Sequence, residues 1–312
     1  MARQDTSMAG LAASVLSEVM VVGELAVYSL IAAYWRMLDR GKKAEFIGLE
    51  NQLAKTLSME GKVSGELTLR LFHWFDKPAA EAIALTMNPF LPGLTCRPDD
   101  ARRFVSSDPR IAEALEEPVT GMSQEKVAIL AEKLYKLLYD ESRSARRPSE
   151  LIGYAYHTET PGLNDLREAA YKLQALAEVK GLPYTTATAS TTLQVAAAAT
   201  IAYSSTLRGT CEAIYSTHSS KPSPKQEGRL RYIVVQGDNM VLGIVQQQLS
   251  LLGDLQNQAV AAAETSNGLT VLLEALLDSY GYAWLKEALG KGCISHIEDT
   301  PLARLEPGRC RL

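Results

Sequence analysis

The spacing of hydrophobic residues predicts a helix over residues 123–139. Val127, Leu130, Leu134 and Leu138 recur at intervals of three and four residues, which places them on one helical face. Ser123 precedes this stripe and is a favourable N-cap residue, because its hydroxyl can accept a backbone N–H of the first turn. We therefore expect an amphipathic helix that buries its leucine face.

Similar patterns, separated by loops rich in proline and glycine, predict most of the remaining first half. We expect helices over residues 8–40, 45–59 and 79–87, and a further helix that Asn164 caps and that Gly181 and Pro183 stop. Residues 66–75 alternate only in part, so both strand and helix remain open there.

The second half has a different texture. Residues 185–207 are rich in small and β-branched side chains, which fit either a strand followed by a helix or one closely packed helix; we expect the helix over 193–207. A solvated loop or partly disordered insertion is expected over 218–228. An apolar run over 229–235 predicts a strand. Two long helical patterns, 241–264 and 269–289, are joined by TSNG and predict an antiparallel helical hairpin.

These elements predict a mainly α fold of helical-bundle type, with a small β element near residues 229–236. The charged, proline-containing stretch near residue 147 is the best candidate for a boundary. It would separate an N-terminal helical region, 1–147, from a C-terminal region, 148–312, that holds the β element and the helical hairpin. The same stretch also fits a surface loop within one domain.

Composition narrows the class of protein. The 312 residues are 46% hydrophobic and 22% charged, with a net charge of −4, which is typical of a folded globular protein without a global basic field. Residues 8–35 are long enough to span a bilayer, but Glu18 and Glu24 lie within them. Each would cost roughly 2.5–3.5 kcal/mol near the bilayer centre, so we expect no membrane partner.

The four cysteines, Cys96, Cys211, Cys293 and Cys310, have no short pair spacing of the kind that zinc and iron–sulfur sites use. No secretory signal pattern precedes them. We therefore expect a cytoplasmic protein with reduced cysteines.

One acidic turn lies between two apolar runs. Residues 231–245 read RYIVVQGDNMVLGIV, and this arrangement resembles the metal-binding hairpin of template-directed polymerases. The sequence VQGDN is most similar to the corresponding segment in polymerases of negative-strand RNA viruses. The resemblance implies that Asp238 is a metal ligand at the tip of two strands.

Two-metal phosphoryl transfer also requires a second carboxylate on a neighbouring strand. Asp165 is the nearest candidate, but it lies at a predicted helix start, and the basic nucleotide-gripping motif is absent upstream. We therefore favour an ordinary four-residue hairpin or strand-to-helix turn, in which Asp238 caps a helix that begins near Met240.

Other catalytic signatures are absent from the sequence. His73 lies in LFHWF and suits a hydrogen-bonded core histidine, while His157, His218 and His296 lie far apart, without metal-binding spacing. No G-x-S-x-G elbow and no phosphate-binding glycine loop occurs. We accordingly assign no catalytic residue, no metal site and no cofactor.

Basic residues cluster in two loops and suit contacts to phosphate groups, because mobile cations and serine hydroxyls bind a nucleic-acid backbone without reading bases. Tyrosines nearby, Tyr154, Tyr156, Tyr215 and Tyr232, are candidates to stack on bases. The candidate nucleic-acid-binding residues are Arg143, Arg146, Arg147, Lys221, Lys225, Arg229 and Arg231.

The sequence favours a non-catalytic helical subunit of a larger assembly, with other protein subunits and single-stranded nucleic acid as partners. RNA-guided surveillance complexes and viral nucleocapsids are assemblies of this class. Two alternatives stay open. One is an enzyme, for example of nucleotidyl transfer, with a non-local site that includes Asp238, and the other is an adaptor that binds only proteins.

Overall fold

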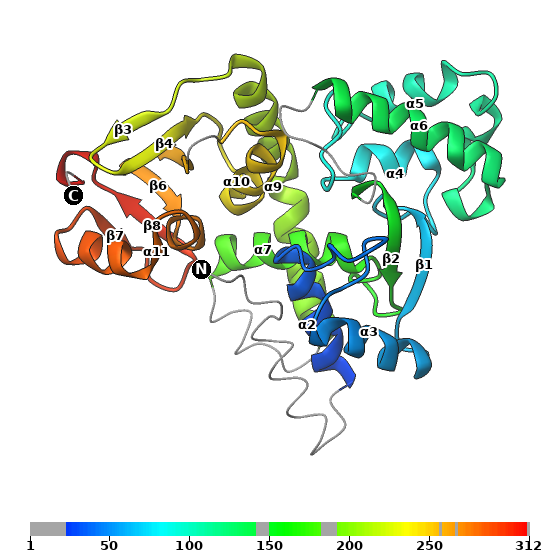
Figure 1. Cartoon of the computed structure of the whole chain (residues 1–312), viewed down its shortest axis with the longest axis horizontal. Coiled ribbons are helices and arrows are strands. Elements are labelled where there is room, and N and C mark those ends of the chain that lie inside the picture. Colours follow the sequence, from blue (N-terminus) through cyan, green and yellow to red (C-terminus); the bar gives the residue numbers. More distant parts are fainter. Residues whose placement is uncertain (1–22, 142–149, 182–191, 256–257, 266–267, 311–312) are drawn as a thin grey trace. The chain divides into compact units, whose positions relative to one another are not determined.

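The computed structural model describes residues 23–141, 150–181, 192–255, 258–265 and 268–310, and these form two compact units (Figure 1). The first unit holds the described residues up to Tyr171 and the second those from Lys172 onwards, so the division falls within one helix, α7. The boundary expected near residue 147 lies in a stretch, 142–149, outside the described residues.

The first unit combines short helices with a two-stranded antiparallel sheet. Leu67 pairs with Tyr154 in this sheet, and Leu69 pairs with Ile152. The core lies among the helices that follow the first strand, with Trp74, Ile83 and Leu134 fully buried. Its elements are α2 (Gly23–Trp35), α3 (Leu49–Met59), β1 (Ser64–Leu69), α4 (Ala79–Leu85), α5 (Pro98–Ser106), the short helices η1 (Ala112–Glu116) and η2 (Val119–Gly121), α6 (Gln124–Glu141), β2 (Ile152–His157) and the start of α7 (Leu166–Lys180).

The second unit is built on a six-stranded sheet in the order β3-β4-β5-β6-β8-β7. Only β4 and β5 run parallel, and α10 connects them; the other neighbours are antiparallel. The elements are the end of α7, α9 (Thr192–Ser220), β3 (Lys225–Glu227), β4 (Leu230–Val235), α10 (Leu242–Leu252), β5 (Val260–Thr265), β6 (Gly268–Leu272), α11 (Leu273–Gly290), β7 (Ile294–His296), β8 (Leu302–Leu305) and η4 (Pro307–Arg309).

Both faces of β4 and β5 are covered. Leu230 and Tyr232 point into a core that also contains Trp284 of α11. The alternate residues Ile233 and Val235 are buried as well. Because successive side chains of a strand point to opposite faces, β4 is enclosed on two sides, which explains its nearly continuous apolar sequence.

Several predicted elements are present. The helix over 123–139 appears as α6, and Ser123 Oγ accepts the N–H of Lys126 at 3.3 Å, as its N-cap role requires. The helix expected over 193–207 appears as the longer α9, and the strand at 229–235 is β4. Helix is the commonest element, as predicted, but the β part is much larger than predicted, and the fold is mixed α/β.

The predicted helical hairpin at the C-terminus is wrong. Gly253 adopts a left-handed conformation (φ 80°) and ends α10, after which residues 260–265 and 268–272 form the hairpin of β5 and β6. The alanines 261–263, which suit a helix by propensity, pair with β4 instead and are buried. Burial within the sheet therefore outweighs local helix preference here.

Two other local expectations are corrected. Residues 218–228 are not a solvated loop, because His218 belongs to α9 and Lys225–Glu227 form β3. Asn164 does not cap α7. Asp165 does so, and its Oδ1 accepts the N–H groups of Arg167 at 2.9 Å and Glu168 at 3.0 Å.

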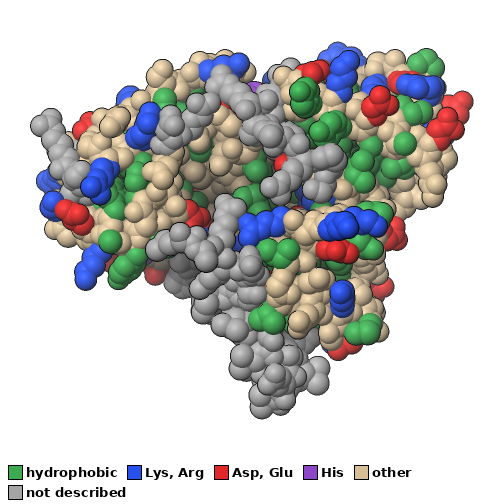
Figure 2. Space-filling model, in the orientation of Figure 1, with side chains coloured by type: hydrophobic (Ala, Val, Ile, Leu, Met, Phe, Trp, Pro, Cys, Tyr) green, Lys and Arg blue, Asp and Glu red, His purple; other side chains and the backbone are tan. Residues whose placement is uncertain are grey.

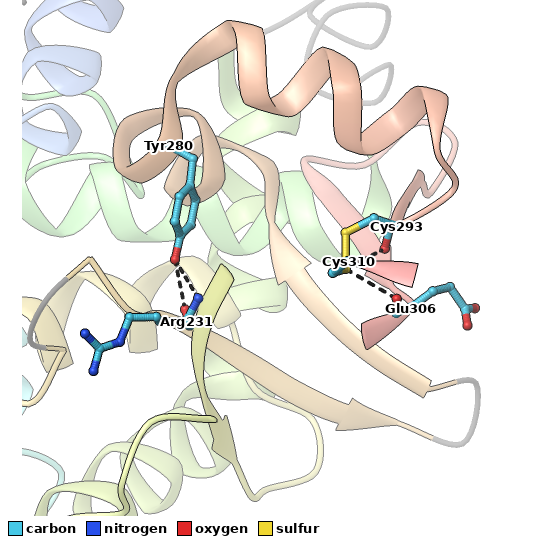
Figure 3. Close-up of a disulfide and its surroundings, with 5 residues drawn as sticks. All are labelled: Arg231, Tyr280, Cys293, Glu306 and Cys310. Atoms are coloured by element: carbon cyan, nitrogen blue, oxygen red, sulfur yellow. Dashed lines mark hydrogen bonds between the residues drawn. A yellow bond between two sulfur atoms is a disulfide. The ribbon is translucent and has the colours of Figure 1, made fainter. Parts of the chain in front are cut away.

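A disulfide joins Cys293 and Cys310 near the end of the second unit (Figure 3). The expectation that the cysteines are reduced is therefore wrong for this pair. The Cα atoms lie 4.7 Å apart although 17 positions separate them in sequence, because the chain folds back through β7 and β8. Scattered cysteine spacing does not reveal such a tertiary approach.

Candidate functional site

Four of the predicted nucleic-acid-binding residues lie on or beside the β3–β4 hairpin. Lys225 lies on β3 opposite Tyr232, and Arg231 lies on β4 opposite Gln226. Arg229 lies in the hairpin turn, and Lys221 follows the end of α9. Lys221, Lys225 and Arg229 are exposed, whereas Arg231 is half-buried. The structure thus brings Lys225, Arg229 and Arg231 onto one hairpin, with Lys221 just before it in the chain.

These four cations form no ion pair with a carboxylate of the described residues. Exposed arginines elsewhere behave differently: Arg102 pairs with Glu116 at 3.1 Å, and Arg208 pairs with Glu212 at 2.7 Å. On the face shown in Figure 2, Lys and Arg side chains lie along the outer edge of the second unit, where Figure 1 places β3 and β7, with acidic side chains between some of them.

Arg231 also has a structural role through its backbone. Its N–H donates to the hydroxyl of Tyr280 on α11 at 2.8 Å (Figure 3). That hydroxyl also donates to the carbonyl oxygen of Gln258 at 2.9 Å. The hydroxyl of Tyr280 therefore links the backbone at the start of β4 to the backbone just before β5. Of the four cations, Lys221, Lys225 and Arg229 are the ones whose side chains are exposed to solvent.

The remaining predicted binding residues do not join this surface within the described structure. Arg143, Arg146 and Arg147 lie outside the described residues. Tyr156 and Tyr232 are buried, and Tyr156 stacks on Phe46 with ring centroids 5.3 Å apart. The interpretation of these two tyrosines as stacking platforms for bases is wrong, because neither ring face is accessible.

The turn of residues 236–239 leads from β4 into α10 and not into a second strand. It is thus a strand-to-helix turn, one of the two forms that the sequence allows, and it lacks the two-stranded geometry of a polymerase hairpin. Asp238 is exposed, and its carboxylate has no hydrogen-bond partner among the described residues. It does not cap α10, whose N-cap position is Val241.

Neutral hydrogen bonds fix this turn against α9. The side-chain amide of Asn239 donates to the carbonyl oxygen of Ser205 at 2.6 Å, and the N–H of Val241 donates to Oγ1 of Thr210 at 2.9 Å. On the sheet side, the amide of Gln236 donates to the carboxylate of Glu264 at 3.0 Å. The turn is exposed but firmly anchored.

Gly209 of α9 permits the closest part of this contact. A Cβ atom at this position would lie 2.3 Å from the carbonyl oxygen of Asp238 and 2.6 Å from that of Asn239. Both neighbours are backbone atoms, which cannot move aside without displacing the turn. A glycine inside a long helix is unfavourable by propensity, so its presence here reflects this close approach.

Asp238 and Glu264 lie at the same end of the sheet. Val235 pairs with Ala263 in the parallel ladder, so the turn after β4 and the end of β5 are adjacent at the carboxyl ends of the two strands. Ligands of α/β sheets bind at such strand ends. However, the described residues contain no group of three or more His, Cys, Asp or Glu side chains that could hold a metal ion.

The histidines serve structural contacts. His73 is predicted as a hydrogen-bonded core histidine. Its Nε2 lies 2.9 Å from Oε2 of Glu168 and its Nδ1 lies 3.0 Å from Oδ1 of Asp76, while its backbone N–H donates to Asp165. Burial alone would lower the pKa of His73, but its hydrogen bond and the charges of these acids raise it to about 9. His218 is paired with Asp254 at 2.7 Å, a buried contact that sequence spacing does not reveal.

Comparison with known proteins adds a fold likeness but no family. No family model matches the sequence, and no curated protein matches it. The structure is similar to the crystal structure of CDC45 from Entamoeba histolytica, with a TM-score of 0.55 and 10% sequence identity. The likeness covers 93% of this chain and 66% of that chain. At this identity it concerns the fold alone. No helix of the described residues is both long and apolar enough to cross a membrane.

The contact between the turn and α9 gives a testable prediction. We expect Gly209→Ala to lower the free energy of unfolding by about 1–3 kcal/mol through overpacking, although alanine is otherwise the better helix former. Gly290→Ala on α11 is the control, because no atom lies within 4 Å of the added Cβ. Urea denaturation measures both. Equal stability of the two variants would contradict the close packing of the turn on α9.

Proposed function

We propose that the protein is a non-catalytic, nucleic-acid-binding subunit of a larger assembly of the nucleoprotein type. The observation that supports this most is a basic surface on and just before the β3–β4 hairpin, where the exposed Lys221, Lys225 and Arg229 lack carboxylate partners among the described residues. A cation without an internal partner remains available for phosphate, whereas a paired cation must first give up its carboxylate.

The ligand chemistry follows from this arrangement. Lysine and arginine on a short hairpin supply point charges and hydrogen-bond donors to phosphate oxygens. Backbone contacts of this kind bind single strands with little sequence preference. RNA-guided surveillance complexes and viral nucleocapsids are assemblies in which a subunit of this type would serve, and other protein subunits are its expected partners.

We expect the double variant Lys225→Ala/Arg229→Ala to bind a labelled single-stranded oligonucleotide more weakly. The slope of log K against log salt concentration should become shallower by about 1.4, because two phosphate contacts are lost at roughly 0.7 each for single strands. Fluorescence anisotropy over a salt series measures this. The control is Arg102→Ala/Arg208→Ala, which removes the same charge from two paired sites. Equal slopes for the two double variants would contradict the proposal.

A second candidate function is nucleotidyl or phosphoryl transfer at the Gln236–Asn239 turn. It is favoured by one observation: Asp238 is exposed, without a partner among the described residues, at the carboxyl end of β4 and beside the end of β5, which carries Glu264. Carboxylate oxygens are the ligands that Mg²⁺ prefers, and two metal-bound carboxylates would suffice to begin such a site.

For this second candidate, we expect Asp238→Asn to reduce Mg²⁺-dependent nucleotide transfer about 100-fold or more, as removal of a charged transition-state contact does. Incorporation of a labelled nucleotide on a primed template measures the activity. Glu212→Gln, an exposed acid on α9, is the control and should leave it unchanged. Full activity of Asp238→Asn, or none in the unaltered protein, would exclude this candidate.

A further inference from the structure

The start of α10 is held by an acid from another helix. Glu178 of α7 accepts the N–H of Leu242 at 2.7 Å through Oε2 and the N–H of Gly243 at 2.8 Å through Oε1. The first N–H groups of a helix have no partner within it and are usually satisfied by a side chain at the N-cap. Val241 occupies the N-cap of α10 and cannot do this, so Glu178 performs the role from a distance in sequence.

The surroundings of Glu178 are shaped for this contact. The amide of Gln174, one turn earlier on α7, donates to Oε1 of Glu178 at 2.7 Å. Gly243 leaves the necessary space: a Cβ there would lie 2.5 Å from Nε2 of Gln174 and 2.8 Å from Oε1 of Glu178. Gln174 therefore donates to the Glu178 carboxylate, Gly243 leaves room for it, and Val241 leaves the N–H groups of α10 for it to accept.

This contact also bears on the exposed turn. Only Met240 and Val241 separate Asn239 from the residues that Glu178 holds. The bonds that anchor Asn239 and Val241 to α9 use an amide and a hydroxyl, which do not titrate. Glu264 contacts the other end of the turn and is itself exposed. Among these contacts, the half-buried one made by Glu178 is thus the one whose hydrogen bonds can change with pH.

Burial raises the pKa of Glu178 to about 7, and the hydrogen bonds from Gln174, Gly243 and Leu242 offset the rise only in part. The groups of the described residues that face this carboxyl from α7 and α10 are that amide and those two N–H groups, and none of them is charged. Because this pKa lies above the ordinary value of 4.5, the contribution of Glu178 to stability is complete below pH 4.5 and is lost as the pH rises through 7. Ionisation strengthens the hydrogen bonds that Glu178 accepts from α10. It also places a charge in a site shielded from water, and this second effect is the larger one, so the folded chain loses stability.

We propose that Glu178 is a proton-controlled latch on the Gln236–Asn239 turn. The ionised carboxylate accepts both N–H groups of α10 and holds the start of this helix in place. A proton on one oxygen converts that oxygen from an acceptor into a hydroxyl, which can no longer accept the facing N–H well. One of the two bonds is then lost, and the turn that leads into α10 gains freedom. The latch does not depend on the proposed function of the basic hairpin.

Nuclear magnetic resonance of the full chain tests this latch between pH 5 and 9. We expect the carboxyl carbon of Glu178 to titrate near neutral pH, and the amide protons of Leu242 and Gly243 to shift downfield with the same inflection as the carboxylate forms. Below the inflection, the ¹⁵N relaxation of Asp238 and Asn239 should report larger backbone motion than above it. Amides in the middle of α10 should show neither effect.

Glu178→Gln is the matched variant, since it keeps the shape and removes the proton equilibrium. It should abolish the neutral-pH inflection at Leu242 and Gly243, whereas Glu212→Gln should retain it. A Glu178 carboxyl carbon that titrates below pH 5, or turn motion that is the same on both sides of the inflection, would overturn the proposal. These readings come from the unaltered protein, so they decide the matter even if Glu178→Gln does not fold.

Discussion

The second unit depends on the contact of the Gln236–Asn239 turn with α9 at Gly209. This contact sets where β4 ends and α10 begins, and α10 in turn makes the crossover that places β5 parallel to β4. The hairpin of β5 and β6, and the later strands beside it, extend the sheet from that parallel pair. Without the glycine the turn would be pushed off α9, and the capping contact with Glu178 would be displaced with it.

Local sequence patterns predicted an element correctly where all of the residues that define it lie within that element. The leucine stripe and Ser123 identify α6, and the apolar run before Gln236 identifies β4, because both signals lie within one element. The basic residues of the β3–β4 hairpin could also be named from the sequence. The sequence could not show whether those cations pair with carboxylates. Ion pairs depend on which side chains meet on the folded surface, and among the described residues these cations have none.

Contacts between distant residues account for most of what sequence reasoning missed. Residues 260–263 lie in a predicted helix but form part of β5, because pairing with β4 buries them. The Cys293–Cys310 disulfide, the His218–Asp254 pair and the cap that Glu178 supplies to α10 all join residues that no local motif connects. Gly209 inside α9 and Val241 at the N-cap of α10 are unusual residues for their positions. The reason for each becomes visible only in the fold, where the turn lies against Gly209 and Glu178 caps α10.

The Gly-Asp-Asn turn joins a strand to a helix within a parallel β–α–β unit. Nuclear Overhauser contacts measured on the isotope-labelled chain test it most directly. The structure predicts cross-strand contacts between Val234 and Ala262 in a parallel pattern, together with successive amide–amide contacts along Leu242–Leu252. Antiparallel contacts between residues 231–235 and 241–245, on either side of the turn, would contradict this account and restore the two-stranded hairpin that the sequence resembles.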